Sequence, residues 1–337
     1  MTVLLVALAV AFAWSMGAHY TGACMGMPHA LKAVKAWQAL LIMAPLAWLG
    51  ATVASHGVEH TVADRLTTHP LGTGAEIIVV GVAFALTTVF TQLKIPTSTI
   101  QILVFAVAGA ALGDGVGVAW STIGVLAAVW VAAPVVAAGL GFGLTRLLDR
   151  VPALRSDRSQ PAVSPHPPAA APGEPGARGL IGAALIVVGA AASFVMGSND
   201  VANATGSLVA THTFSPLVAG VVGGGGLALG VLTWGRPLLR RVAFDIVKLD
   251  RPMATAAQAV QALVVVTAVA FGFFTSMNQA LIGAMAGVGA ARGRDTVNRP
   301  VLVGIVRGWV IGPGAGIAAA YVVARIAAAL AGRGALG

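Results

Sequence analysis

One stretch of the sequence puts a carboxylate and two carboxamides inside an otherwise apolar segment. It reads GSNDVANATG from Gly197 to Gly206, with the acid at Asp200 and the amides at Asn199 and Asn203. An ionised carboxylate inside a membrane is costly unless it is paired, so we predict that Asp200 binds a cation or a proton. The alternatives are a helix cap and a protonated acid in a hydrogen-bond network. The two amides are four residues apart, so they lie on one helical face. There they either bind the substrate and the cation or form hydrogen bonds with neighbouring helices.

Two other polar segments, residues 96–101 and 275–279, each precede an apolar run that is too short to cross a membrane alone. We predict that each run is half of a broken helix or a re-entrant hairpin. Such a break leaves helix N–H groups and a positive dipole end for an anion, and carbonyls or carboxylates for a cation. Hydroxyl groups donate hydrogen bonds to a tetrahedral oxyanion, although they also cap the helix that follows. The candidate oxyanion ligands are Thr97, Ser98, Thr99, Gln101, Thr275, Ser276 and Gln279, together with Asn199 and Asn203.

The composition requires a lipid bilayer around these residues. Hydrophobic residues make up 58% of the 337 residues, charged residues 9%, and the mean hydropathy is +0.89, which excludes a water-soluble globular protein. A span needs about 20 apolar residues. Apolar runs occur at residues 2–16, 36–55, 74–93, 102–113, 119–145, 180–197, 216–234, 253–274, 280–290 and 301–331. We therefore predict an all-α polytopic membrane protein.

The basic residues predict the orientation of the chain. If every run crosses once and the N-terminus lies outside, only Arg65, Arg325 and Arg333 fall on or near the outer side. The positive-inside rule then places the basic side in the cytoplasm, and the pI near 11 reflects loop charge rather than binding to nucleic acid. In this arrangement Glu59 lies in an outer loop, and Asp200 is the one carboxylate well within an apolar run.

A proline-rich segment divides the chain into two membrane repeats. Residues 149–178 contain Pro, Ser, Ala and charged residues without periodicity, which predicts a flexible cytoplasmic linker. It separates an N-terminal membrane repeat, residues 1–148, from a C-terminal membrane repeat, residues 179–337.

The two halves share a weak internal repeat. Met16-Gly17 recurs 180 residues later, Thr97-Ser98 recurs 178 residues later and Trp130-Val131 recurs 179 residues later. About five membrane segments per half is an odd number, so we predict inverted repeats with broken or re-entrant helices at the centre. Many secondary transporters have this architecture.

These motifs resemble those of a known family. The stretch from Gly197 to Gly206 is similar to the GANDxANAxG signature of the inorganic phosphate transporter (PiT) family, and residues 95–99 resemble its Pro-x-Ser-Thr-Thr segment. Residues 280–313 resemble its C-terminal region. The resemblance implies that the signature occurs once in each inverted half, and that both copies line one phosphate site with adjacent sodium sites.

The first copy of the signature departs from that pattern. Residues 17–26 read GAHYTGACMG, in which His19 and Tyr20 stand where the second copy has Asn-Asp, and Ala23 stands where it has the later Asn. The missing acid removes a cation ligand and an acceptor for the hydroxyl of a protonated oxyanion. In lacking this acid, the first motif resembles that of the sulfate permease branch of the family. His19 either carries a positive charge that favours an anion and couples to protons, or is a neutral hydrogen-bonded histidine.

We expect secondary-active transport of inorganic phosphate across the cytoplasmic membrane, coupled to sodium or protons, with Asp200 as the sodium ligand in the first case. The alternative substrate is sulfate or a related oxyanion, and a passive anion channel is less favoured. An enzyme is disfavoured because no nucleophile, metal cluster or second buried carboxylate accompanies His19 or Asp200. We expect no cofactor and no nucleic acid partner, and a homodimer is an open alternative to a monomer.

Overall fold

The computed structural model describes residues 1–93, 97–152, 175–239, 247, 249–293 and 298–334 of the chain. Most of the predicted linker lies outside the described residues, and so do Ile95 and Pro96. The named elements of the described chain are all helices, and Thr67 and Val118 form an isolated antiparallel bridge. The helices are α1 (Thr2–His19), α2 (Thr21–Ala30), α3 (Ala36–Ala54), α4 (His56–Asp64), α5 (Thr73–Gln92), α6 (Thr99–Gly113), α7 (Trp120–Leu148), α8 (Pro175–Ala210), α9 (Pro216–Trp234), η3 (Arg236–Leu238), α10 (Arg251–Ala270), α11 (Met277–Arg292) and α12 (Arg299–Gly334).

Eight helical segments of the described chain are long and apolar enough to cross a membrane. They are Thr2–Ala30, which joins α1 and α2, then α3, α5 and α7, residues Gly179–Ala210 of α8, α9, α10, and residues Leu302–Ala331 of α12. α6 and α11 have 15 and 16 residues and are shorter than a full span. Each predicted apolar run lies largely on one helix, and the two short runs lie on α6 and α11.

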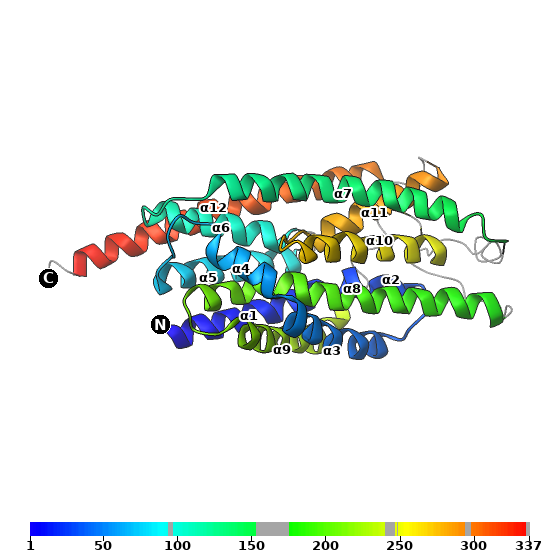
Figure 1. The fold of residues 1–337 in the computed structure, drawn as a ribbon, viewed down its shortest axis with the longest axis horizontal. Coiled ribbons are helices and arrows are strands. Elements are labelled where there is room, and N and C mark those ends of the chain that lie inside the picture. Colours follow the sequence, from blue (N-terminus) through cyan, green and yellow to red (C-terminus); the bar gives the residue numbers. More distant parts are fainter. Residues whose placement is uncertain (94–96, 153–174, 240–246, 248, 294–297, 335–337) are drawn as a thin grey trace.

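The helices lie roughly along one long axis, and their contacts occur in matched pairs (Figure 1). α6 packs on α12 while α7 packs on α11, and α3 packs on α8 while α1 packs on α9. The internal repeat aligns α6 with α11 and α7 with α12, so the α6–α12 contact in one half corresponds to the α11–α7 contact in the other. It likewise aligns α1 with α8 and α3 with α9, so the α3–α8 contact corresponds to the α9–α1 contact. α7 and α12 run in opposite directions along the long axis, as the colours of Figure 1 show.

Glycines make the close contacts between the matched helices. A Cβ atom added to Gly109 of α6 would lie 2.3 Å from the carbonyl oxygen of Ile317 in α12, and one added to Gly287 of α11 would lie 2.0 Å from that of Ala138 in α7. Any side chain at these two positions would collide with the neighbouring backbone, so glycine allows the helices to approach closely. The two short helices are thereby held firmly against long ones.

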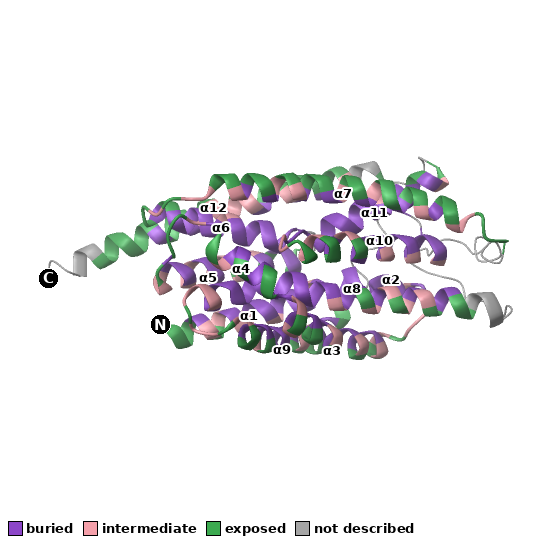
Figure 2. Cartoon of the chain, in the orientation of Figure 1, coloured by how far each residue is buried: buried purple, intermediate pink, exposed green. Residues whose placement is uncertain are grey.

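Burial separates the central helices from the periphery (Figure 2). All the described residues of α11 from Met277 to Ala284 are buried, whereas α7 and α12 expose apolar side chains such as Val131 and Val310. Val131 and Val310 are equivalent in the internal repeat. An exposed apolar face of this kind suits contact with lipid, and the polar residues of the interior are shielded from it.

Candidate functional site: two helix N-termini around Asp200

The GSNDVANATG motif lies within the continuous helix α8, and its polar side chains point into the protein. Asn199, Asp200 and Asn203 are all buried. The Asn199 amide bonds twice to the backbone of Thr275: its Nδ2 donates to the Thr275 carbonyl over 2.8 Å, and its Oδ1 accepts from the Thr275 N–H over 3.1 Å. Asn199 therefore fixes the chain directly before α11.

The short helices α6 and α11 begin in the same way. Ser98 is the N-cap of α6 and accepts from the backbone N–H of Gln101 over 3.3 Å, and Ser276 is the N-cap of α11 and accepts from the N–H of Gln279 over 3.3 Å. The capping role considered from the sequence is thus present for both serines. Each helix still directs its remaining N-terminal N–H groups and its positive dipole end toward the interior.

The two N-termini meet each other and the motif on α8. Nε2 of Gln101 donates to Oε1 of Gln279 over 3.4 Å, and Nδ2 of Asn203 donates to the Thr99 hydroxyl over 3.4 Å. The hydroxyls of Thr97 and Thr275 are buried and have no hydrogen-bond partner among the described residues. All the candidate ligands predicted from the sequence are therefore brought into one buried region: Thr97, Ser98, Thr99, Gln101, Asn199, Asn203, Thr275, Ser276 and Gln279.

Asp200 lies in this region with two amides and the Tyr20 hydroxyl as its partners. Its Oδ2 accepts from Nδ2 of Asn199 over 3.1 Å and its Oδ1 accepts from Nδ2 of Asn203 over 3.4 Å. The ion pairs in the described part of the chain involve other acids: Asp64 with His60, and Asp149 and Asp250 with Arg292. Two amides and the Tyr20 hydroxyl carry no full positive charge to pair with a carboxylate, so the geometry suits a cation or proton at Asp200.

His19 ends α1 and lies between α5 and α11. Its Nδ1 is 2.7 Å from the Thr91 hydroxyl, and its Nε2 is 3.2 Å from Nδ2 of Asn278. The next residue, Tyr20, bonds to the Thr99 hydroxyl over 2.8 Å. The residues that replace the Asn-Asp pair thus contact both short helices, although they supply no carboxylate.

Two buried acids were missed or misplaced by the sequence reasoning. Glu59 was expected in an outer loop, but it lies on α4 with no exposed surface, and its Oε1 accepts from the Thr205 hydroxyl over 3.2 Å. Glu76 of α5 is also buried and accepts a hydrogen bond from Ser207. The chain thus has buried carboxylates besides Asp200, which are bonded to Thr205 and Ser207 rather than to the amides around Asp200. The hydroxyls of Thr205, within the motif, and Ser207, directly after it, were the available signal.

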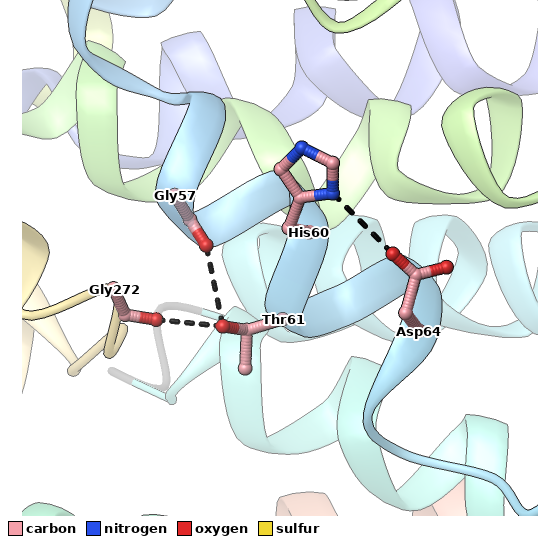
Figure 3. Close-up of polar contacts among 5 residues, drawn as sticks. All are labelled: Gly57, His60, Thr61, Asp64 and Gly272. Carbon is pink, nitrogen blue, oxygen red and sulfur yellow. Dashed lines mark hydrogen bonds and ion pairs between the residues drawn. The ribbon is translucent and has the colours of Figure 1, made fainter.

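α4 is buried because it is anchored to the second half of the chain (Figure 3). The Thr61 hydroxyl contacts the carbonyl of Gly272, in the turn between α10 and α11, over 2.7 Å, and that of Gly57 over 3.2 Å. His60 and Asp64 point to the opposite, exposed side and pair with each other over 3.3 Å. A short polar segment can thus be half inside the protein, which hydropathy alone does not reveal.

Comparisons with known proteins agree with this fold. The model of the "Phosphate transporter family" matches residues 16–320. The chain is 33% identical over 139 residues to a "Putative phosphate permease" of Haemophilus influenzae, a match that covers 38% of this chain and 33% of that protein. It is 25% identical over 322 residues to the sulfate permease CysP of Bacillus subtilis, covering 93% of this chain and 84% of the permease. The solved structure of "The sodium-dependent phosphate transporter" superposes with a TM-score of 0.85 at 22% identity, covering 96% of this chain and 98% of that one.

Proposed function

Because the chain belongs to the phosphate transporter family, whose members are transporters and not enzymes, we propose that it carries inorganic phosphate across the cytoplasmic membrane by secondary-active transport coupled to sodium or protons. Two inverted halves alternate access to the site between α6, α8 and α11. The opposite directions of α7 and α12 and the matched helix contacts support this arrangement (Figure 1).

The observation that carries the proposal is the position of Asp200. It is fully buried between two helix N-termini, and its partners among the described residues are the amides of Asn199 and Asn203 and the hydroxyl of Tyr20, with no cationic side chain. An oxyanion bound at those N-termini adds negative charge to a site that already holds a carboxylate. A co-transported cation offsets both charges, which links the movement of the anion to that of the cation.

The donors and acceptors of the site suit this division of roles. The unpartnered hydroxyls of Thr97 and Thr275 supply donors for phosphate oxygens next to the helix N-termini. For the cation, Asp200 is joined by the amide oxygens of Asn203 and Gln101, which are buried and have no partner in the described chain. Oxygen ligands of this kind suit a hard cation such as sodium.

Sulfate is the second candidate substrate. Of the two permeases named above, the sulfate permease covers the larger share of this chain, 93% against 38%. The first signature copy also has Tyr20 at the position equivalent to Asp200. These two observations favour an oxyanion without a hydroxyl, whereas the family model favours phosphate.

The test is uptake by the purified full chain in proteoliposomes. Labelled phosphate and labelled sulfate are offered separately, each with an inward sodium gradient or an inward proton gradient. We expect phosphate to accumulate in the vesicles above its equilibrium level with one of the two gradients. Sulfate should remain largely outside. Equilibration without accumulation would indicate a passive channel, and uptake of neither anion would overturn the proposal.

A further inference from the structure

The orientation of the Asn278 amide, like that of Asn199, is fixed by its partners. It is the second residue of α11 and is buried, and its Nδ2 donates to the Thr97 carbonyl over 3.0 Å and contacts Nε2 of His19 over 3.2 Å. The carbonyl accepts hydrogen bonds and cannot donate. Rotating the amide would place oxygen against oxygen at Thr97, so Nδ2 must face that carbonyl.

The protonation of His19 follows from the same contacts. The Thr91 hydroxyl donates its hydrogen to the Thr87 carbonyl over 2.7 Å, so it accepts from Nδ1 of His19. Nε2 faces an amide N–H and must accept from it. Nδ1 therefore carries the hydrogen and Nε2 does not, which makes the imidazole neutral. These contacts suit the neutral alternative for His19, and the Thr97 carbonyl is a further hydrogen-bond partner of the ring.

The consequence concerns the other atom of the Asn278 amide. Both N–H hydrogens of Nδ2 are used by Thr97 and His19, and Oδ1 is buried without a partner among the described residues. The amide lies between the start of α11 and the residue before the N-cap of α6. The other unpartnered amide oxygens there are held less firmly, because Gln101 and Asn203 make bonds of 3.4 Å.

We propose that Oδ1 of Asn278, oriented by His19, accepts the hydroxyl hydrogen of a protonated tetrahedral oxyanion and so selects hydrogenphosphate over sulfate. This inference rests on the proposed function. Helix N-termini and threonine hydroxyls bind the bare oxygens of either anion, whereas an acceptor that cannot rotate attracts a hydroxyl and repels a bare oxygen. Asn278 is a specificity-determining residue whose Oδ1 takes over the acceptor role of the lost acid, and His19 is a positioning residue.

The first experiment needs no substitution. Uptake of labelled phosphate by the wild-type chain in proteoliposomes is measured in the presence of unlabelled arsenate, selenate or sulfate, each added separately as a competitor. Arsenate carries a hydroxyl near neutral pH, whereas selenate and sulfate do not, and arsenate is larger than sulfate. We expect arsenate to compete well and both selenate and sulfate to compete poorly. Equal competition by arsenate and selenate, with phosphate uptake intact, would overturn this inference alone; absence of any uptake would overturn the proposed function as well.

The second experiment tests the positioning role. His19→Phe removes the acceptor at Nε2 and frees the Asn278 amide to rotate, so sulfate should compete about 3- to 10-fold better, the size expected for one hydrogen bond. His19→Gln keeps an acceptor at that reach and should restore the preference. Asn278→Leu should relax selectivity as His19→Phe does.

Thr87→Val is the matched control, because it removes another buried unpartnered oxygen without contact to Asn278. Its preference for phosphate should equal that of the wild type. The ratio of the two anions, rather than the rate, is the readout, since a purely structural defect lowers uptake of both. An unchanged ratio in both His19→Phe and Asn278→Leu would refute the assignment.

Discussion

The side chains of Gln101 and Gln279 meet between the two short helices, with Nε2 of Gln101 3.4 Å from Oε1 of Gln279. The residues occupy equivalent positions in the internal repeat and each is the third residue of its helix. The contact joins the halves at the point where the substrate is proposed to bind. Movement of one half against the other must change or break it.

A double-mutant cycle tests whether this pair acts as a unit. Gln101→Leu or Gln279→Leu should each lower the initial rate of phosphate uptake about 3- to 10-fold, because each leaves one buried amide without its partner. The double variant should be about as impaired as either single one. Gln92→Leu, at the exposed end of α5, is the control and should retain wild-type uptake. Losses that multiply in the double variant would show that the two amides act independently.

Asp200→Asn should abolish uphill uptake while the protein still reaches the membrane. The amide keeps the shape of the side chain but removes the negative charge that retains the coupling cation. Uptake against a gradient and the amount of protein in the membrane are measured together. Asp64→Asn is the control, because Asp64 has an exposed side chain and pairs only with His60 in the described chain. Full accumulation by Asp200→Asn would remove Asp200 from the cation site.

Gly197→Ala should destabilise the fold. A Cβ atom at Gly197 would lie 1.9 Å from the carbonyl oxygen of Ala47, and one at the equivalent Gly17 would lie 2.0 Å from that of Leu227. Separating the helices should cost about 1–3 kcal/mol of unfolding free energy. Thermal unfolding in detergent measures the loss. Gly139→Ala on the exposed side of α7, where a Cβ meets nothing within 4 Å, should not destabilise. Equal melting temperatures for the wild type, Gly197→Ala and Gly139→Ala would contradict the close-packing explanation.

Arg292→Met should weaken the junction of α7, α10 and α11. Nη2 of Arg292 pairs with Asp149 at 2.8 Å and with Asp250 at 3.3 Å. Its loss leaves two carboxylates near each other without this cation, which should lower the unfolding free energy by about 1–3 kcal/mol, less than for a fully buried pair. Asp149→Asn should cost less because Asp250 still pairs with the arginine. His60→Gln removes an exposed pair and should not measurably change the melting temperature. A loss of stability for Asp149→Asn greater than for Arg292→Met would contradict this role of the arginine.

Local signals in the sequence determined much of this protein. The apolar runs predicted the spans because hydropathy is a property of contiguous residues. The short apolar runs on α6 and α11 and the serines at positions 98 and 276 predicted two half-length helices with capped N-termini. The carboxylate in the GSNDVANATG motif identified the centre of the site, because an acid in an apolar run requires a partner.

Only the tertiary structure decided which side chains meet. His19 and Asn278 are 259 residues apart, and no periodicity or motif relates them. Glu59 is buried because Thr205 and the turn at Gly272 cover α4, although its local sequence is polar. The sequence by itself specified which segments are helices and where charge enters the membrane. The pairing of hydrogen-bond donors with acceptors depends on how those helices pack, and packing is set by contacts between residues far apart in the chain.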